Sequence, residues 1–463
     1  MTKLVRRQWG FGLRAVCVSA SLAHLIIVIM AVSVTVLGQQ IGHPTIQHGV
    51  VPTRGTFAIR NAHIVTVSGP DIENGSILVR DGKIAAVGAN LSIPANTQMI
   101  DARGLFVYPG LIDAGTALGL VEVGQGANGT VDTAETGELN PNARALVAVN
   151  PHSAHIAVTR VDGITTVLSL PSGGLISGQA TLINLLGTAP LEMAVVPQAA
   201  LVVSYPRLGT RGGDFGSTQQ TANLTELLNT SNRQVEQIRK MLRDAEAYGR
   251  ARDAYAKDRS LPRPDQDVVL EALVPYVRGE RPVIFRADRE AEIRSAIAFA
   301  EEMKLKPIIL GADDAWKITD LLKQKDVPVI LTGVLSLPLR EDDPYDTMFE
   351  AASKLQKAGV RFCISTGNSG SAVRNLPFHA GMAAAFGLPK DEALKAVTLY
   401  PAQILNVADR LGSIEPGKIA NLVITDGDPL ETRTHIRRLF IEGRDIPLTS
   451  RHTELNEAFR NRR

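Results

Sequence analysis

Cysteine is scarce in this sequence, with two residues among 463. One of them, Cys17, lies in an N-terminal apolar segment, so the rest of the chain keeps only Cys363. This excludes an internal disulfide in that part and any C-x-x-C metal site. An excess of one charge is also missing, because 49 Lys and Arg residues face 47 Asp and Glu residues, and no basic stretch is interleaved with aromatics. Nucleic acid is therefore not an expected partner.

The N-terminal segment has the composition of an export signal. Basic residues from Lys3 to Arg14 precede the apolar run AVCVSASLAHLIIVIMAVSVTVLG, which ends in the small residue Gly38. This order is typical of a secretory signal peptide, predicted here over residues 1–38. The alternative is an uncleaved membrane anchor, since the run is about as long as the ~20 residues that span a bilayer. In both cases we expect the folded part to be exported, into a periplasm. It would be attached to a membrane only if the signal is not cleaved.

Two flanking regions, residues 56–108 and 406–450, have the pattern of short β-strands. In the first, GSILVR and KIAAVG are separated by Asp81-Gly82, a pair that indicates a β-hairpin. A similar pattern of short strands and turns appears in GSIEPGKIANLVITDGDPL near the C-terminus. We expect both flanks to build one composite β-sandwich.

The middle of the chain, residues 109–405, alternates apolar strands such as RPVIFRA and DVPVILTG with amphipathic helices such as REAEIRSAIAFAEEM. Alternation over this length favours a parallel α/β fold, and a (β/α)₈ TIM-like barrel fits best. A doubly wound sheet is the alternative, but no G-x-G-x-x-G follows the first strand. A polar helical insertion at about 221–258 is read as a solvated face on the barrel rim, with a partner-binding or lid role as the alternative.

Several longer motifs carry a family resemblance. The segments YPGLID, SGGLISGQATLINL, ALVPYVRGERPV and RNLPFHAGMAAAFGLPKDEALKAVTLYPAQIL, with GSIEPGKIANLVI after them, come in the order found in the amidohydrolase superfamily. The chain resembles most the exported branch related to imidazolonepropionase, over nearly everything after the signal. The resemblance implies the barrel with its sheet domain, and hydrolysis of non-peptide carbon–nitrogen bonds.

The resemblance also implies where a metal site belongs. Active relatives end the first strand in H-x-H, the fifth and sixth in histidine and the eighth in aspartate, and such ligands hold a zinc-type ion that activates water. Here every matching position is substituted. The six residues that stand there are Gly115, Ala117, Arg286, Asp288, Gly311 and Asn368 (or Gly367 if the register slips by one). We therefore predict a vestigial site at the strand ends and no metal cofactor, where the family would use zinc or another divalent ion.

The chemistry of the substituted residues differs from that of the ligands they would replace. Gly115, Ala117 and Gly311 have no donor atom, and Asn368 carries no charge and is not a general base. Arg286 stays protonated and would repel a divalent cation. Our hypothesis is that its guanidinium partly replaces the lost positive charge, with Asp288 as a salt-bridge partner.

Other residues do not obviously rebuild a catalytic site. His152 and His155 share a predicted helix face, but no third ligand accompanies them, and His379 is expected to be structural. Asp113 is expected to support the end of the first strand. Carboxylates at 313 and 314 are expected to favour the N-terminal dipole of a following helix. A serine or cysteine route lacks a histidine base near Cys363 or the serines after it.

Two function classes remain open from the sequence. The first is the family activity, hydrolysis of carbon–nitrogen bonds, which requires a metal site that the substituted positions do not supply. The second is a non-catalytic pseudoenzyme that binds a small-molecule ligand or pairs with another chain. That chain would be a second copy in a homo-oligomer or an active amidohydrolase homologue. Because function resides in the site rather than in the scaffold, the substituted residues favour the second class.

Overall fold

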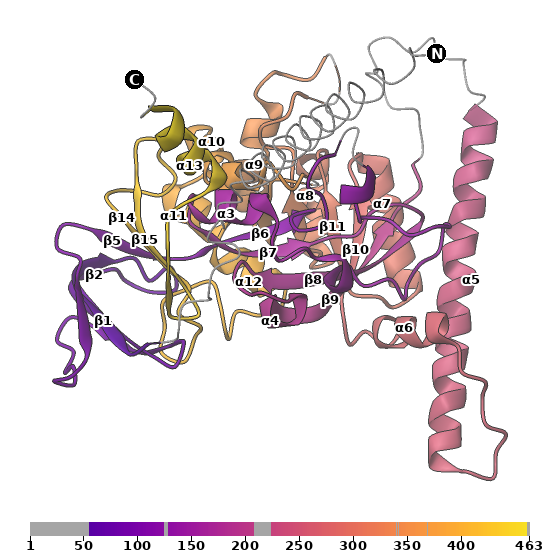
Figure 1. The fold of residues 1–463 in the computed structure, drawn as a ribbon. Coiled ribbons are helices and arrows are strands. Elements are labelled where there is room, and N and C mark those ends of the chain that lie inside the picture. The colour runs from indigo at the N-terminus through magenta and orange to yellow at the C-terminus, as the bar shows by residue number, and fades with distance from the viewer. Residues whose placement is uncertain are drawn as a thin grey trace, which may run out of the picture. The chain divides into compact units, whose positions relative to one another are not determined.

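The computed structural model describes residues 55–124, 128–207, 224–338, 340, 342–367 and 369–460. The predicted signal segment, residues 1–38, lies outside these ranges. Among the helices of the described ranges, none is long and apolar enough to cross a membrane. The described strands form two separate hydrogen-bonded sheets (Figure 1).

The first sheet is built from both flanks of the chain. Its strands run in the order β16-β15-β14-β5-β1-β2-β3, and β4 pairs with β1 beside β5. The N-terminal flank supplies β1 (Phe57–Ile64), β2 (Ile72–Arg80), β3 (Lys83–Gly88), β4 (Gln98–Asp101) and β5 (Phe106–Pro109), and the C-terminal flank supplies β14 (Leu422–Thr425), β15 (Ile436–Ile441) and β16 (Arg444–Ile446).

Local sequence explains how this sheet is joined. Asp81 and Gly82 both have positive φ, 51° and 79°, which is the backbone of the tight turn that joins β2 to β3. The two flanks meet where β14 pairs antiparallel with β5. Phe57 of β1 stacks on Phe440 of β15 with ring centroids 4.8 Å apart, so the core of this sheet contains side chains from both flanks.

The second sheet is the predicted eight-stranded barrel, and this prediction is confirmed. Its strands follow chain order and lie beside one another in that order. They are β6 (Leu111–Thr116), β7 (Ile164–Ser169), β8 (Ile176–Asn184), β9 (Ala194–Ser204), β10 (Val283–Ala287), β11 (Pro307–Gly311), β12 (Val329–Leu331) and β13 (Phe362–Ile364). Alternate residues such as Leu168, Val202 and Ile284 fill the interior, where each is completely buried.

One strand departs from the predicted strand–helix alternation. Strand β8 is antiparallel to both β7 and β9, whereas the other neighbouring pairs are parallel. Only a short loop joins Ser169 to Ile176, and parallel strands need a crossover of a dozen or more residues. The chain therefore turns back directly after β7. The other consecutive barrel strands are separated in the chain by at least one helix.

The barrel closes between β13 and β6 through side chains. The carboxylate of Asp113 on β6 accepts hydrogen bonds from the hydroxyls of Ser365 and Thr366, which directly follow β13. Ser365 also donates to the carbonyl of Gly115, at 2.9 Å. These contacts hold the first and last strands together at their carboxyl ends.

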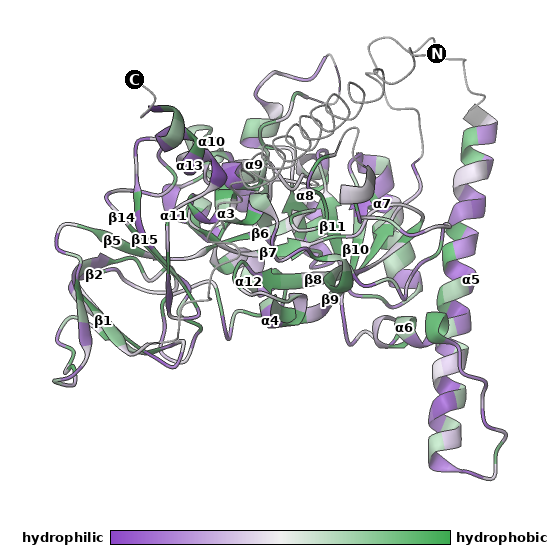
Figure 2. Ribbon diagram, in the orientation of Figure 1, coloured by the Kyte–Doolittle hydropathy of each residue, from purple (hydrophilic) through white to green (hydrophobic). Residues whose placement is uncertain are grey.

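Helices cover the barrel and connect its strands. Those of the described residues are α2 (Ala145–Ala148), α3 (Ala154–Arg160), α4 (Pro190–Met193), α5 (Leu224–Lys257), α6 (Val268–Val277), α7 (Glu290–Glu302), α8 (Thr319–Gln324), α9 (Thr347–Ala358), α10 (Leu376–Ala385), α11 (Lys390–Lys395), α12 (Leu399–Ile404) and α13 (Arg451–Arg460). The predicted insertion is the long helix α5, which packs against α6 (Figure 1). Figure 2 shows that hydrophilic residues occupy much of α5, whereas the barrel strands are mainly hydrophobic.

Candidate functional site at the barrel mouth

The carboxyl ends of the barrel strands form a mouth that contains the predicted site positions. Gly115 lies near the end of β6 and is buried, and Ala117 directly beyond this strand is 1% exposed. A Cβ atom added to Gly115 would lie 3.0 Å from Leu310 Cδ1 and 3.1 Å from Ser365 Oγ. The space beside Gly115 is therefore already filled by side chains of β11 and of the segment after β13.

At the ends of β11 and β10, the side chain of Asp288 fills the space beside Gly311. Gly311 has a φ of +98°, and a Cβ atom at this position would lie 2.0 Å from Asp288 Oδ1. Real Cβ atoms do not approach an oxygen this closely, so the carboxylate stands where the side chain of residue 311 would begin. The backbone fixes Asp288 in place, because its carbonyl accepts a hydrogen bond from the Asp314 amide at 2.9 Å.

Arg286 extends from β10 across the mouth. Its Nη2 donates to the carbonyl of Pro171 at 3.0 Å, and Pro171 follows β7, which is separated from β10 by two strands. Its Nε is buried without a hydrogen-bond partner among the described residues. Burial lowers the pKa of Arg286 to about 10, and the charge of Asp288 acts against this shift. Even with this shift, the guanidinium stays protonated at neutral pH.

Asn368, the remaining predicted position, lies outside the described residues. Gly367, the alternative in that register, has a φ of +81°, and a Cβ atom there would lie 3.4 Å from Thr332 Cβ. Gly367 therefore adds no side chain to the described site.

Asp113 has the supporting role that the sequence predicts. It is completely buried, and its carboxylate also accepts hydrogen bonds from the amides of Gly115 at 3.1 Å and Thr366 at 3.2 Å. Burial raises the pKa of Asp113, and the hydrogen bonds from Ser365 and Thr366 oppose that rise. Because Ser365 is committed to this carboxylate and to the Gly115 carbonyl, it is not an activated nucleophile.

Asp313 and Asp314 lie in different surroundings beside the mouth. Asp314 is 2% exposed and forms ion pairs with Arg340 at 3.1 Å and Lys317 at 2.8 Å. Its carboxylate also accepts a hydrogen bond from the amide of Glu290, the first residue of α7, at 3.2 Å. Arg340 was not identified from the sequence because it lies 26 residues further along. Asp313 has no ion-pair partner among the described residues, and burial together with the charges of Asp288 and Asp314 raises its pKa to about 7.

His152, His155 and His379 make individual contacts with their surroundings. The His155 ring contacts the Glu122 carbonyl at 2.9 Å, and the His152 amide donates to Asn150. His379 is buried in α10, and burial lowers its pKa to about 4. Over the described ranges, no group of three or more His, Cys, Asp or Glu side chains has the geometry to hold a metal ion.

Comparison with known proteins gives the relatives of this fold. A model of the Amidohydrolase family matches residues 287–455. An amidohydrolase from Thermotoga maritima MSB8 is 25% identical, with a TM-score of 0.74, over 84% of this chain and 99% of that one. The imidazolonepropionase of Brucella anthropi is 24% identical over 405 residues, which cover 81% of this chain and 94% of that protein. The chain belongs to the amidohydrolase superfamily.

The predicted relation to the imidazolonepropionase branch of amidohydrolases is also confirmed. Amidohydrolase tasK of Hapsidospora irregularis is 24% identical over 391 residues, and this chain spans 39% of the length of that protein. Membership of the superfamily supports, in general terms, hydrolysis of carbon–nitrogen bonds. Which chemistry this chain retains depends on its own residues at the barrel mouth.

Proposed function

We propose that this chain is a non-catalytic amidohydrolase that acts as a partner subunit of another amidohydrolase-fold chain. The observation that carries the proposal is the position of Asp288, whose carboxylate lies 2.0 Å from the Cβ site of Gly311. In the family pattern a metal-binding histidine stands at that glycine. The volume which its imidazole would use is thus occupied by an acidic side chain from the neighbouring strand.

The donor set of the mouth supports the same proposal. Zinc-type ions are bound by imidazole, thiolate and carboxylate, and a catalytic site uses three protein ligands. Most of the matching positions supply glycine, alanine or a protonated guanidinium, which offer no lone pair to a metal, and Asn368 supplies only a neutral amide. Asp288 alone supplies a carboxylate. The residues therefore do not fit the metal ion of the family, and no hydrolytic step is assigned to them.

An exposed apolar segment beside the mouth supports a role in binding another chain. The loop that follows β12 carries Leu335, Leu337 and Tyr345, which are 42%, 88% and 74% exposed. Exposed large apolar side chains become buried when such a loop binds another protein, and this burial is favourable. The loop lies at the carboxyl end of the barrel strands, so a bound chain would cover the mouth.

Metal analysis tests the non-catalytic part of the proposal. The protein is purified without added metal, and its metal content is measured before and after incubation with zinc, beside an H-x-H-containing relative as positive control. We expect less than about 0.1 equivalent of zinc in this chain and near one equivalent in the relative, because structural and catalytic zinc sites bind tightly. One equivalent that supports amide hydrolysis would contradict the proposal.

Co-purification tests the partner role. Tagged protein is expressed with an H-x-H-containing amidohydrolase from the same genome, and complex formation is measured by size exclusion with light scattering. We expect a stable complex that Leu337→Ser and Tyr345→Ser weaken. Leu191→Ser is the matched control, because Leu191 is 74% exposed on α4, at the amino end of β9. Equal loss with the control variant, or no complex at all, would reject the partner role.

A further inference from the structure

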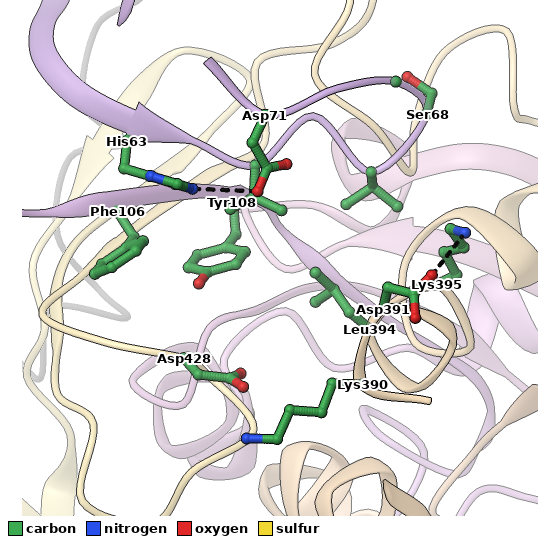
Figure 3. A pocket seen from close by; sticks show the side chains of 13 residues that line it. His63, Ser68, Asp71, Phe106, Tyr108, Lys390, Asp391, Leu394, Lys395 and Asp428 are labelled. Atoms are coloured by element: carbon green, nitrogen blue, oxygen red, sulfur yellow. Dashed lines mark hydrogen bonds and ion pairs between the residues drawn. The ribbon is translucent and has the colours of Figure 1, made fainter. Parts of the chain in front are cut away.

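A second concave site lies away from the barrel mouth, between the first sheet and helix α11. It is a cavity of about 540 Å³, and Figure 3 shows side chains of β1 and β5 on one side and of α11 on the other. Its lining includes an aromatic wall and several charged groups. No residue of the barrel-mouth site contributes to it.

The aromatic wall is formed by neighbouring strands. Phe106 and Tyr108 stand two residues apart on β5, and their rings stack with centroids 6.2 Å apart and an angle of 23°. His63 of β1 is directly opposite Phe106 in the strand pairing, with ring centroids 4.9 Å apart. Asp71 and Glu73 contact the two nitrogens of His63 at 3.2 and 2.8 Å, so the imidazole is held in a fixed orientation.

Tyr108 presents a hydroxyl to this cavity without a protein partner. The side chain is buried, with 6% exposed, and no hydrogen bond to its hydroxyl is formed by the described residues. In Figure 3 this hydroxyl points into the space between the sheet and α11. The hydroxyl itself is open to the cavity, so it is available to hydrogen-bond to a polar group of a ligand.

The charges around the cavity leave one carboxylate unpaired. Lys390 forms an ion pair with Glu431 at 3.1 Å, and Lys395 pairs with Glu392 at 2.8 Å and Asp391 at 3.3 Å. Asp428 accepts a hydrogen bond from the Leu430 amide at 2.9 Å, but no basic side chain among the described residues pairs with it. The negative charge of Asp428 contributes, after burial, to raising the pKa of Tyr108.

The backbone of the cavity wall is strained. Val67 has a φ of +69°, which is unusual for a β-branched residue and costs free energy. The turn is held by Thr66, whose hydroxyl donates to the Gly69 carbonyl at 2.8 Å and whose carbonyl accepts from the Ile414 amide at 3.1 Å. Such strain is concentrated at ligand-binding segments in proteins.

From these groups we propose that the cavity between β5 and α11 binds an organic cation, a primary ammonium or guanidinium group attached to a flat apolar body. The cation would donate hydrogen bonds to the Asp428 carboxylate and the Tyr108 hydroxyl. The faces of Phe106 and Tyr108 would contact the flat body and add a cation–π attraction. The cation belongs either to a free amine or to a lysine or arginine side chain of a peptide.

Binding of matched probes tests this proposal by calorimetry on the full folded chain. Benzylamine, benzyl alcohol and benzoate share one ring and differ in charge. We expect benzylamine to bind at least about tenfold more tightly than benzyl alcohol, since a charge-assisted hydrogen bond contributes that much, and benzoate to bind least. Equal binding of the three probes, or tighter binding of benzoate, would overturn the proposal.

Variants test whether the probes bind in this cavity. Tyr108→Phe removes only the hydroxyl, and Asp428→Asn removes only the charge while an oxygen remains for the Leu430 amide. We expect each to weaken benzylamine about three- to tenfold, with unchanged melting temperature without ligand. Asp409→Asn, at an exposed aspartate paired with Arg410 at 3.9 Å, is the control. If both cavity variants bind benzylamine as wild type does, the assignment is wrong.

Binding of two peptide probes distinguishes the two sources of the cation. Acetyl-Gly-Lys-Gly-amide and acetyl-Gly-Arg-Gly-amide present the same groups on a chain. Tighter binding of the peptides than of benzylamine, lost in Asp428→Asn, would identify a peptide side chain as the ligand. Tighter binding of benzylamine, lost in the same variant, would identify a free amine.

Discussion

At the scale of single residues, the barrel mouth contains two glycines, and in each case neighbouring side chains fill the space beside the glycine. Gly311 and Asp288 depend on one another, because the carboxylate fills the space that the glycine leaves. Gly115 likewise leaves room for Leu310 and Ser365. Each pair excludes a larger side chain at the glycine.

The pair at 311 and 288 gives a stability prediction. Gly311→Ala should destabilise the fold by about 3 kcal/mol or more, because it combines a positive φ with a clash against Asp288. Gly417→Ala is the matched control, since Gly417 has a φ of +92° with no heavy atom within 4 Å of its Cβ site. It should cost about 1 kcal/mol. The measurement is urea denaturation of both variants.

The same clash can be removed from the other side. In an Asp288→Ala background, the cost of Gly311→Ala should fall to that of Gly417→Ala. An unchanged cost in this background would show that the strain comes from the backbone alone.

Asp313 gives a pH-dependent prediction. Its pKa is raised from 3.8 to about 7, so the folded state binds a proton more tightly than the unfolded state does. Stability should therefore decrease as pH rises from about 4 to 7, by up to about 4 kcal/mol at 1.36 kcal/mol per unit. Asp313→Asn should remove this part of the decrease. The difference between the two unfolding curves, measured from pH 4 to 8, checks it, and parallel curves would contradict it.

Much of the residue-scale description was visible in the sequence. The substitutions at Gly115, Ala117, Arg286 and Gly311 follow from motifs with fixed spacing. The contact of Asp288 with the space beside Gly311 was not visible, because it depends on a positive φ and on the register of β10 against β11. The cavity beside the Tyr108 hydroxyl was missed for a similar reason, since its lining comes from segments that are distant in the sequence.

At the scale of elements, helix α5 is joined to the barrel by a short apolar strip. Ile238, Leu242 and Ala245 are buried with at most 1% exposed, although charged residues surround them. Arg239 adds a two-point contact to Glu302 of α7, with both distances at 2.9 Å. The spacing of these apolar residues follows one face of a helix.

Substitutions in this strip should lower the stability of the protein more than substitutions at exposed positions of α5. Leu242→Ala should destabilise the protein by about 2–4 kcal/mol, as expected for a buried leucine. Leu228→Ala, at a leucine that is 40% exposed on the same helix, should cost less than about 0.5 kcal/mol. Thermal unfolding of the two variants measures the difference. Similar costs would show that α5 is not anchored through this strip.

The type of most elements could be predicted from periodicity, and their directions only in part. The helix predicted over 289–303 is α7, and the strand in RPVIFRA is β10. The reversed direction of β8 was not predicted, although the short loop with Gly173 and Gly174 is a signal for it. Both glycines have positive φ, which a tight reversal of the chain uses.

At the scale of the whole molecule, the first sheet depends on segments from both ends of the chain. Strand β14 lies between β5 and β15, so the C-terminal flank provides inner strands as well as the edge strand β16. Helix α13, by contrast, has no buried residue.

Truncations should separate these two parts. A chain that ends at Leu405 lacks β14 to β16 and should be insoluble, because β5 loses its partner and the core loses Phe440. A chain that ends at Ser450 lacks only α13 and should keep its free energy of unfolding within about 1 kcal/mol. Soluble expression and circular dichroism report both outcomes. A folded, soluble chain ending at Leu405 would contradict the dependence on both flanks.

The position of β14 also has a consequence for the order of events during synthesis. In the chain, 312 residues separate Pro109 at the end of β5 from Leu422 at the start of β14. A ribosome that adds 5–20 residues per second needs roughly 15–60 s to cover that distance. For this time the edge of β5 that β14 will cover has no partner. The nascent N-terminal flank is therefore the part of the chain that a chaperone has most reason to protect.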